Sequence, residues 1–227
     1  MDLSIVVPVY NERKTIKEVI KKLQALPLET KIILVDDGST DGTRAILEKY
    51  TNEENTKIVF QPENGGKGAA LREGFYYIEG EYTVVQDADL EYEPQDLVKM
   101  YEYAKETTAS VVYGNRFWKK GKPENMAWGN YIFNLISAKL ASFLFDQCFN
   151  DVATCYKMFR TDFLKVIPLS CEGFEFCPEV TAKVKRRGIK IHEVPISYTP
   201  RTIGEGKKIR AWHGINFLWT LVKYKIF

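Results

Sequence analysis

The sequence predicts an α/β protein in which a mostly parallel sheet is flanked by helices. In the first 110 residues, short apolar runs rich in β-branched residues alternate with segments whose apolar residues recur every three or four positions. The links between these segments are short, and such alternation of strand and helix is typical of a parallel sheet. The chain has 227 residues, which is enough to bury one substantial core.

The apolar runs and the helical spacing give the expected order of elements. In the first half, we expect strands at residues 4–9, 31–36, 57–60, 82–86 and 109–113, and helices at 12–25, 43–50, 67–78 and 94–107. In the second half, we expect strands at 152–159 and 189–195, and helices at 127–146, 175–186 and 211–227. Ligands bind at the carboxyl ends of parallel strands, so polar residues there are the first candidates for a site.

Composition and charge limit the class of protein. Hydrophobic residues make up 45% and charged residues 27% of the chain, which excludes a disordered tail, a collagen-like rod and a polytopic membrane protein. The formal net charge of +2 hides an asymmetry, because residues 1–113 sum to −8 and residues 114–227 sum to +10. This division suggests a cation or nucleoside site in the first half and an anionic partner for the second half.

The thiols and the N-terminal residues favour a cytoplasmic protein. The four cysteines, at positions 148, 155, 171 and 177, form no CxxC pair and no metal-type spacing, so we expect reduced thiols. The N-terminal residues contain neither a basic segment nor a long apolar one, so no signal peptide is expected. We expect His192 at a strand edge and His213 exposed to solvent.

Asp87 and Asp89 form the strongest chemical motif, because they directly follow an expected buried strand. Two carboxylates in this arrangement can converge on one divalent cation. Mg²⁺ and Mn²⁺ prefer carboxylate oxygens, and such an ion can neutralise a departing diphosphate. The alternative is a pair of loop carboxylates that cap the next helix.

Two further polar segments follow expected strands. Asp37 directly follows the strand expected at 31–36 and could accept hydrogen bonds from a base or a ribose. Asp41 or Thr40 is expected to cap the helix that follows. Lys67 lies in the glycine-rich segment NGGKGAA, where it could meet a phosphate or an acidic neighbour. This segment has neither Walker A nor GxGxxG spacing, and a plain helix-starting turn is the alternative.

These motifs together resemble glycosyltransferase family 2. The first half carries it in VPVYNE (7–12), VDDGSTDGT (35–43), NGGKGAALREG (64–74) and DADLEYEP (87–94). Five segments of the second half are similar to the dolichyl- and polyprenyl-phosphate sugar synthase branch: GNRF (114–117), TCYKMFR (154–160), GFEF (173–176), EVPISY (193–198) and GEGK (204–207). The resemblance implies a GT-A fold with a Rossmann-like sheet, and an inverting, metal-dependent transfer of a hexose from a nucleotide-sugar to a polyprenyl or dolichyl phosphate.

The resemblance also implies roles for individual residues. The expected donor-binding residues are Pro8, Tyr10, Glu12, Asp37, Lys67, Asp87, Ala88 and Asp89. The expected ligands of Mn²⁺ or Mg²⁺ are Asp87, Asp89 and Glu91, and the expected acceptor-phosphate residues are Arg116, Arg201 and Lys207. Of these, Asp89, Arg116 and Arg201 are the expected catalytic residues. The whole chain is then one domain, with residues 1–113 binding the donor and 114–227 the acceptor.

The chemistry of the acceptor agrees with this assignment. A sugar hydroxyl would need a general base, whereas a lipid monophosphate is largely dianionic at neutral pH and needs only cationic positioning. Asp151 could be a base for a hydroxyl acceptor, but we favour a structural carboxylate that holds one of the arginines. Attack on the far face would invert the anomeric centre.

The sequence leaves several alternatives open. Glycine in place of serine in GEGK and the TCYK stretch depart from the family pattern, so GDP-mannose and UDP-glucose both remain candidate donors. A hydroxyl acceptor and a non-catalytic nucleotide-sugar-binding protein are alternative functions. The apolar helices at 127–146 and 211–227 either pack in the core or lie on a membrane. We expect peripheral attachment to the cytoplasmic face of a membrane, with or without a separate anchoring subunit, and no nucleic-acid partner.

Overall fold

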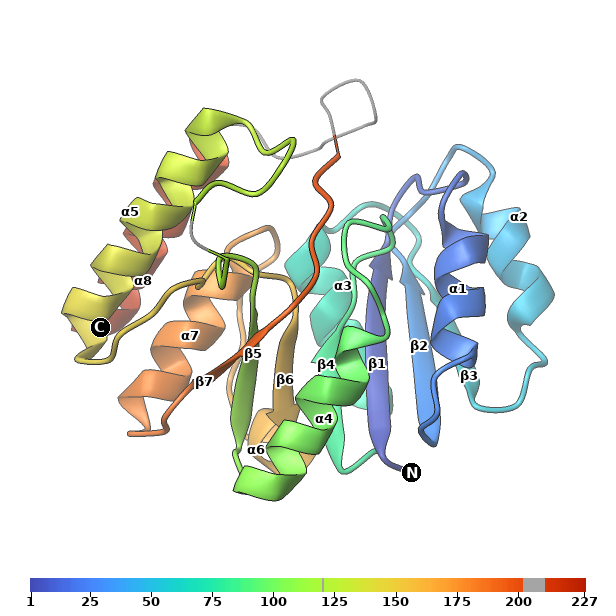
Figure 1. Ribbon diagram of the computed structural model, residues 1–227. Helices are drawn as coiled ribbons and strands as arrows, with labels where there is room; N and C mark the ends of the chain where they lie inside the picture. The colour runs from blue at the N-terminus through green and yellow to red at the C-terminus, as the bar shows by residue number, and fades with distance from the viewer. Residues whose placement is uncertain (120, 202–210) are drawn as a thin grey trace.

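The computed structural model describes residues 1–119, 121–201 and 211–227, and it contains a central sheet with helices on both faces (Figure 1). The strands are β1 (Leu3–Val9), β2 (Thr30–Asp36), β3 (Thr56–Phe60), β4 (Tyr82–Val85), β5 (Val111–Asn115), β6 (Lys157–Arg160) and β7 (His192–Pro195). The helices are α1 (Ile16–Gln24), α2 (Thr43–Leu47), α3 (Lys67–Gly74), α4 (Asp96–Thr107), α5 (Trp128–Phe145), α6 (Thr161–Lys165), α7 (Phe176–Arg186) and α8 (Ala211–Ile226). Single 3₁₀ turns, η1 (Glu48–Tyr50) and η2 (Phe75–Tyr77), extend α2 and α3.

The sheet has the strand order β3-β2-β1-β4-β6-β5-β7. β1 pairs in parallel with β2 and β4, β2 pairs in parallel with β3, and β5 pairs in parallel with β7. Only β6, among the described strands, runs antiparallel to its neighbours β4 and β5. The predicted parallel order of the first half is confirmed, and the order reverses beside β1, which is where such sheets bind ligands.

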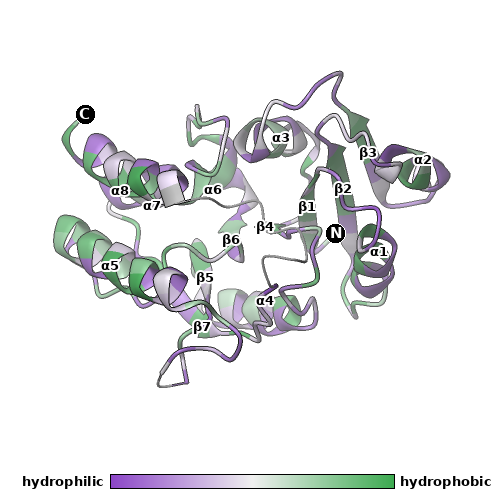
Figure 2. Cartoon of the chain, turned by 90° about the horizontal axis from the view of Figure 1, so that it is seen from above, coloured by the Kyte–Doolittle hydropathy of each residue, from purple (hydrophilic) through white to green (hydrophobic). Residues whose placement is uncertain are grey.

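The helices complete three layers around this sheet. Figure 2 shows α1 and α4 on one face and α3 and α7 on the other. At the β5–β7 end of the molecule α5 and α8 lie side by side, and α8 also packs on α7 (Figures 1 and 2). β1 is central and all its residues except Pro8 are buried, which explains why its sequence is an almost continuous apolar run.

The strand expected at residues 152–159 is wrong for its first half, because β6 begins only at Lys157. The ammonium group of Lys157 is fully buried and donates hydrogen bonds to the carbonyl oxygens of Val152 and Thr154, at 2.9 Å each. The residues that carry these two carbonyl groups are not paired in the sheet. The short helix α6, which follows β6 directly, was not predicted.

The histidines and cysteines divide between confirmed and corrected expectations. His192 begins the edge strand β7, as predicted, and its Nδ1 lies 2.9 Å from the hydroxyl oxygen of Tyr103. His213 is half-buried instead of exposed, because its ring packs edge-on against Phe174 at a centroid distance of 4.9 Å. The four cysteines are free, as expected. None of the described helices is long and apolar enough to cross a membrane.

Candidate active site

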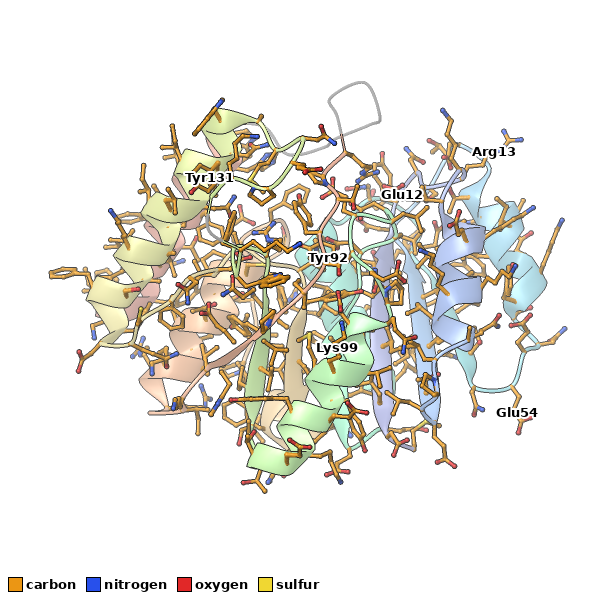
Figure 3. All side chains as sticks on the ribbon, viewed as in Figure 1. Glu12, Arg13, Glu54, Tyr92, Lys99 and Tyr131 are labelled. Carbon is orange, nitrogen blue, oxygen red and sulfur yellow. The ribbon has the colours of Figure 1, made fainter. Side chains whose placement is uncertain are left out.

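Hydrogen bonds tie together the loops that follow β1 and β2. The N–H of Asn11 donates to Ser39 Oγ at 2.9 Å, and the N–H of Glu12 donates to Thr43 Oγ1 at 3.0 Å. The N-cap of α2 is Gly42, so the prediction that Asp41 or Thr40 caps this helix is wrong, although Asp41 Oδ1 accepts the N–H of Thr43 at 3.0 Å. Glu12 therefore has a fixed place at the carboxyl end of the sheet, and Figure 3 shows Glu54 at the opposite end.

Asp37 fixes the glycine-rich segment that precedes α3. Its two carboxylate oxygens accept the N–H groups of Gly65 and Gly66, at 2.8 and 2.9 Å. Burial raises the pKa of Asp37, and these two hydrogen bonds oppose the rise. Gly66 has φ +92°, and a Cβ there would lie 2.4 Å from the carbonyl oxygen of Glu172, so glycine is required. The glycine-rich segment therefore fixes the direction in which the Lys67 side chain enters the site.

Lys67 pairs with the first carboxylate of the Asp87–Asp89 motif. Its Nζ donates to Asp87 Oδ1 and lies 3.7 Å from the thiol sulfur of Cys155. Burial opposes charge on both partners, but their mutual attraction outweighs it, so the pKa of Lys67 is raised and that of Asp87 is lowered. Sequence reasoning missed Cys155, because nothing before β6 indicated that its thiol reaches this pair.

Arg201 contacts the remaining acids of the site. Its Nη2 donates to Asp89 Oδ2 at 2.6 Å, its Nη1 lies 3.3 Å from Glu12 Oε1, and its Nε lies 3.4 Å from Glu91 Oε1. The pKa of Asp89 is nevertheless raised to about 7, because burial and the neighbouring charges of Asp87 and Glu91 outweigh the attraction of Arg201. One guanidinium thus bridges acids that follow β1 and β4.

Tyr198, which sequence reasoning did not assign to the site, separates Arg201 from Arg116. The Tyr198 hydroxyl donates to Glu91 Oε2 at 2.9 Å, and the Arg116 guanidinium carbon lies 4.9 Å from the centroid of its ring. Tyr92 packs on the same ring at a centroid distance of 5.3 Å. The only sequence signal for Tyr198 was its place at the end of the EVPISY motif.

Arg116 is held almost completely by protein groups. Its Nε and Nη2 donate to the two oxygens of Asp151 at 2.6 and 2.8 Å, and Nη2 also donates to Asn134 Oδ1 at 3.0 Å. Burial disfavours its charge, but Asp151 outweighs this and raises the pKa of Arg116. Asp151 is fully buried and is the carboxylate that holds this arginine, which is the role favoured from the sequence.

The structure brings half of the twelve expected site residues into two neighbouring groups of contacts. Arg201 contacts Glu12, Asp89 and Glu91, Lys67 contacts Asp87, and the charge of Asp87 acts on Asp89. Ala88 lies beside them, with its carbonyl oxygen accepting the Thr15 hydroxyl at 2.7 Å. Pro8 and Tyr10 are half-buried at the end of β1. Lys207 lies outside the described residues.

The donor set of the site is compatible with a hard divalent cation. Asp87, Asp89 and Glu91 offer only carboxylate oxygens, the ligands that Mg²⁺ and Mn²⁺ prefer. Within the residues that the structure describes, however, no three His, Cys, Asp or Glu side chains are grouped as a metal site. Lys67 holds Asp87, and Arg201 holds Asp89 and Glu91. A bound cation would therefore share these carboxylates with the protein's own cations or displace them.

A mostly parallel sheet with half-buried acids and paired cations at the switch point of its strand order is typical of a ligand-binding α/β protein. The model of the family "Glycosyl transferase family 2" matches residues 4–167. The chain belongs to this family and is a glycosyltransferase.

Curated relatives lie in the branch expected from the sequence. The chain is 26% identical over 211 residues to the polyprenol monophosphomannose synthase of Mycolicibacterium smegmatis, covering 89% of this chain and 79% of the relative. It is 32% identical over 201 residues to the glycosyltransferase AglJ of Haloferax volcanii, covering 88% of this chain and 64% of the relative. These matches agree with the polyprenyl-phosphate sugar synthase branch.

A solved structure confirms the fold. Glucosyl-3-phosphoglycerate synthase from Mycobacterium tuberculosis, in complex with Mn²⁺, UDP-glucose and phosphoglyceric acid, matches with a TM-score of 0.73. The match covers 99% of this chain and 79% of that chain at 20% identity. The predicted GT-A fold, a mostly parallel sheet flanked by helices, is therefore confirmed.

Proposed function

We propose that this glycosyltransferase moves a hexose from a nucleotide-sugar to a polyprenyl or dolichyl phosphate. The observation that carries the proposal is the position of Arg201, whose guanidinium lies between Asp89 and Glu12, among acids from two strand ends. A cation placed there can meet two anions, the diphosphate of the donor and the phosphate of the acceptor. The M. smegmatis relative is a polyprenol monophosphomannose synthase, which supports the same acceptor class.

The first-half residues would hold the donor. Pro8, Tyr10, Glu12 and Asp37 would contact the nucleoside. Asp89 and Glu91, with Asp87, would ligate Mg²⁺ or Mn²⁺, and a bound ion would neutralise the departing diphosphate. Lys67 would remain beside Asp87 and contribute its positive charge to that side of the site.

The acceptor phosphate would attack without a general base. One of its oxygens forms a bond to the anomeric carbon while the bond from that carbon to the diphosphate breaks, and the bonding electron pair leaves with the diphosphate. A dianionic phosphate oxygen already carries a lone pair for the new bond and has no proton to lose, so the protein has only to position it. Arg201, Arg116 and Lys207 would do so. Asp151 does not serve as a base here, because both of its oxygens bind Arg116.

The surface of α5 and α8 fits a protein that works on a lipid. Large apolar side chains are exposed on both helices, among them Ile136 and Phe143 on α5 and Ile215 on α8. Lys223 and Lys225 follow in the last turn of α8, where they could meet anionic headgroups. We therefore propose peripheral attachment through this face. The four free thiols favour the reducing, cytoplasmic side of the membrane.

A partition assay tests the proposal. The protein is incubated with Mn²⁺, polyprenyl phosphate and labelled GDP-mannose or UDP-glucose, and label is counted in the organic phase. We expect transfer from one of these donors and its loss in Asp89→Ala. Absence of organic-phase label with every common donor would refute the lipid acceptor, and full activity of Asp89→Ala would refute the metal assignment.

A further inference from the structure

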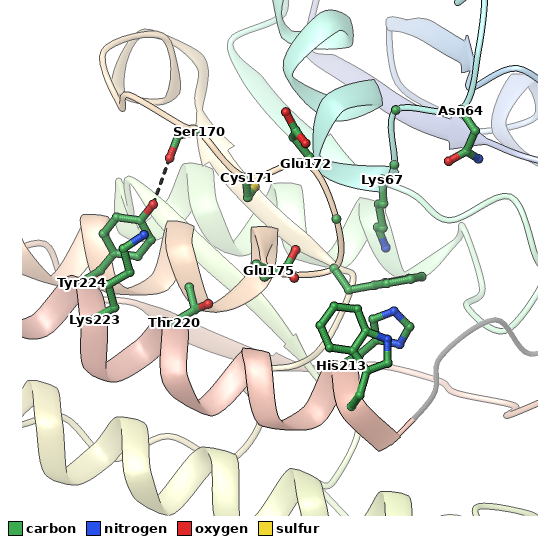
Figure 4. Close-up of a pocket in the computed structure, with 15 residues that line it drawn as sticks. Asn64, Lys67, Ser170, Cys171, Glu172, Glu175, His213, Thr220, Lys223 and Tyr224 are labelled. Atoms are coloured by element: carbon green, nitrogen blue, oxygen red, sulfur yellow. Dashed lines mark hydrogen bonds between the residues drawn. The ribbon is translucent and has the colours of Figure 1, made fainter.

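A groove adjoins the acidic site on the far side of Lys67. It lies between the glycine-rich segment before α3, the loop ahead of α7, and α8, and its volume is about 610 Å³ (Figure 4). Lys67 and His213 face each other from opposite walls near one end of the groove, and a hydrogen bond of 2.9 Å joins Ser170 and Tyr224 at the other. We call the end at Lys67 and His213 the inner end of the groove, because Lys67 also contacts Asp87 of the acidic site.

The inner end combines tilted and edge-on aromatic rings with a carboxylate. The ring of His213 lies 4.9 Å, centroid to centroid, from both Phe174 and Trp212. Trp212 is 56% exposed and lines the groove, so it can contact a ligand there. Glu175 also lines the groove, and its one described side-chain contact is a long hydrogen bond of 3.4 Å from Asn216 Nδ2. A carboxylate has about four acceptor sites, so Glu175 retains capacity for further donors.

This chemistry suits a hexose. A pyranose has an apolar C–H face that can pack on an aromatic ring, and several hydroxyl donors that a carboxylate can accept. Sites of this kind join aromatic walls to a few placed polar groups. A prenyl chain fits less well, because the groove is also lined by Glu172, Lys67 and Lys223, whose charges would lose their hydration beside a hydrocarbon.

We propose that Phe174, Glu175, Trp212 and His213 form the subsite for the transferred hexose and discriminate between sugars. The inference rests on the proposed function for the presence of a nucleotide-sugar donor. It assigns a role to GFEF and to the start of α8, which the donor and acceptor residues above do not include. Lys67 would then stand between the hexose and the acids that would ligate the metal ion.

Binding of sugar-bearing and sugar-free nucleotides tests this proposal. Calorimetry compares GDP-mannose with GDP, and UDP-glucose with UDP, for the wild type, Trp212→Ala and Glu175→Gln, without vesicles or acceptor. We expect each substitution to weaken nucleotide-sugar binding about tenfold, a typical consequence of losing an aromatic stack or a charged hydrogen bond. Binding of GDP and of UDP, which lack the hexose, should not change.

Trp219→Ala is the matched control. Trp219 lies on the same helix, is 61% exposed and does not line the groove, so its replacement should leave binding of both ligands unchanged. Equal loss for nucleotide and nucleotide-sugar, or no loss for either, would overturn the hexose subsite. An increase only in the KM for polyprenyl phosphate, measured in the transfer assay, would also overturn the hexose subsite and would assign the groove to the lipid. Because calorimetry needs no acceptor, its outcome is separate from failure of lipid transfer.

Discussion

Ionisation of Asp89 works against folding. Burial and the charges of Asp87 and Glu91 raise the pKa of Asp89 to about 7, well above its value of about 4 in an unfolded chain. Between these two values the folded protein binds more protons than the unfolded one, so the free energy of unfolding falls as pH rises from about 4 to about 7. The site keeps this unfavourable charge, which fits a residue selected for its ligand.

We expect Asp89→Asn to remove this fall in the free energy of unfolding between pH 4 and pH 7. Urea unfolding of wild type and variant is compared at several pH values from 4 to 8. The stability of the variant relative to wild type should rise through this window by up to about 1.4 kcal/mol per pH unit, the limit for one proton, and then level off. A difference that is constant across the window would contradict the raised pKa.

Asp151 and Arg116 form the most buried ion pair of the site. Their side chains are 0% and 7% exposed, so removal of one charge leaves the other without water. We expect Asp151→Asn to lower the free energy of unfolding by about 3–5 kcal/mol. Asp162→Asn breaks the exposed pair with Arg160 and is the control, with an expected change below about 1 kcal/mol. Equal effects in urea titrations would mean that burial of the Arg116 pair has no consequence.

At the scale of elements, the sequence predicted strands where burial alone determines composition. β1, β2 and β4 are covered on both faces, so their apolar runs were unambiguous. The start of β6 could not be predicted, because it depends on the Lys157 ammonium reaching back to carbonyls three and five residues earlier. Likewise the roles of Tyr198 and Cys155 depend on contacts between segments far apart in the chain.

The exposed face of α5 and α8 gives an element-scale prediction. Phe143 is 85% and Ile215 71% exposed, so replacing either by glutamate should not disturb the core. We expect Phe143→Glu and Ile215→Glu to weaken sedimentation with anionic vesicles about tenfold, through lost apolar burial and added repulsion. Tyr76→Glu changes an aromatic residue that is 81% exposed on η2 and should have no effect. Equal vesicle binding by all four proteins would exclude this face as the membrane contact.

At the scale of the whole molecule, the structure shows where the charges of the negative half (1–113) and the positive half (114–227) of the sequence lie. Glu12, Asp87, Asp89 and Glu91 come from the negative half, and Arg116 and Arg201 come from the positive half. Arg201 joins the two halves at the carboxyl ends of the strands, where it binds acids that follow β1 and β4. Lys67 and Arg116 each pair within their own half, with Asp87 and Asp151. We propose that this is a division between donor and acceptor binding within one domain.

The central claim is that the charge of the acceptor phosphate takes the place of a general base. The most direct measurement compares polyprenyl phosphate with the corresponding polyprenol as acceptors for the same labelled nucleotide-sugar, in the same detergent and at the same concentration. The account predicts glycosylated product from the phosphate and none above background from the alcohol. Equal transfer to both acceptors, or transfer to the alcohol alone, would contradict it.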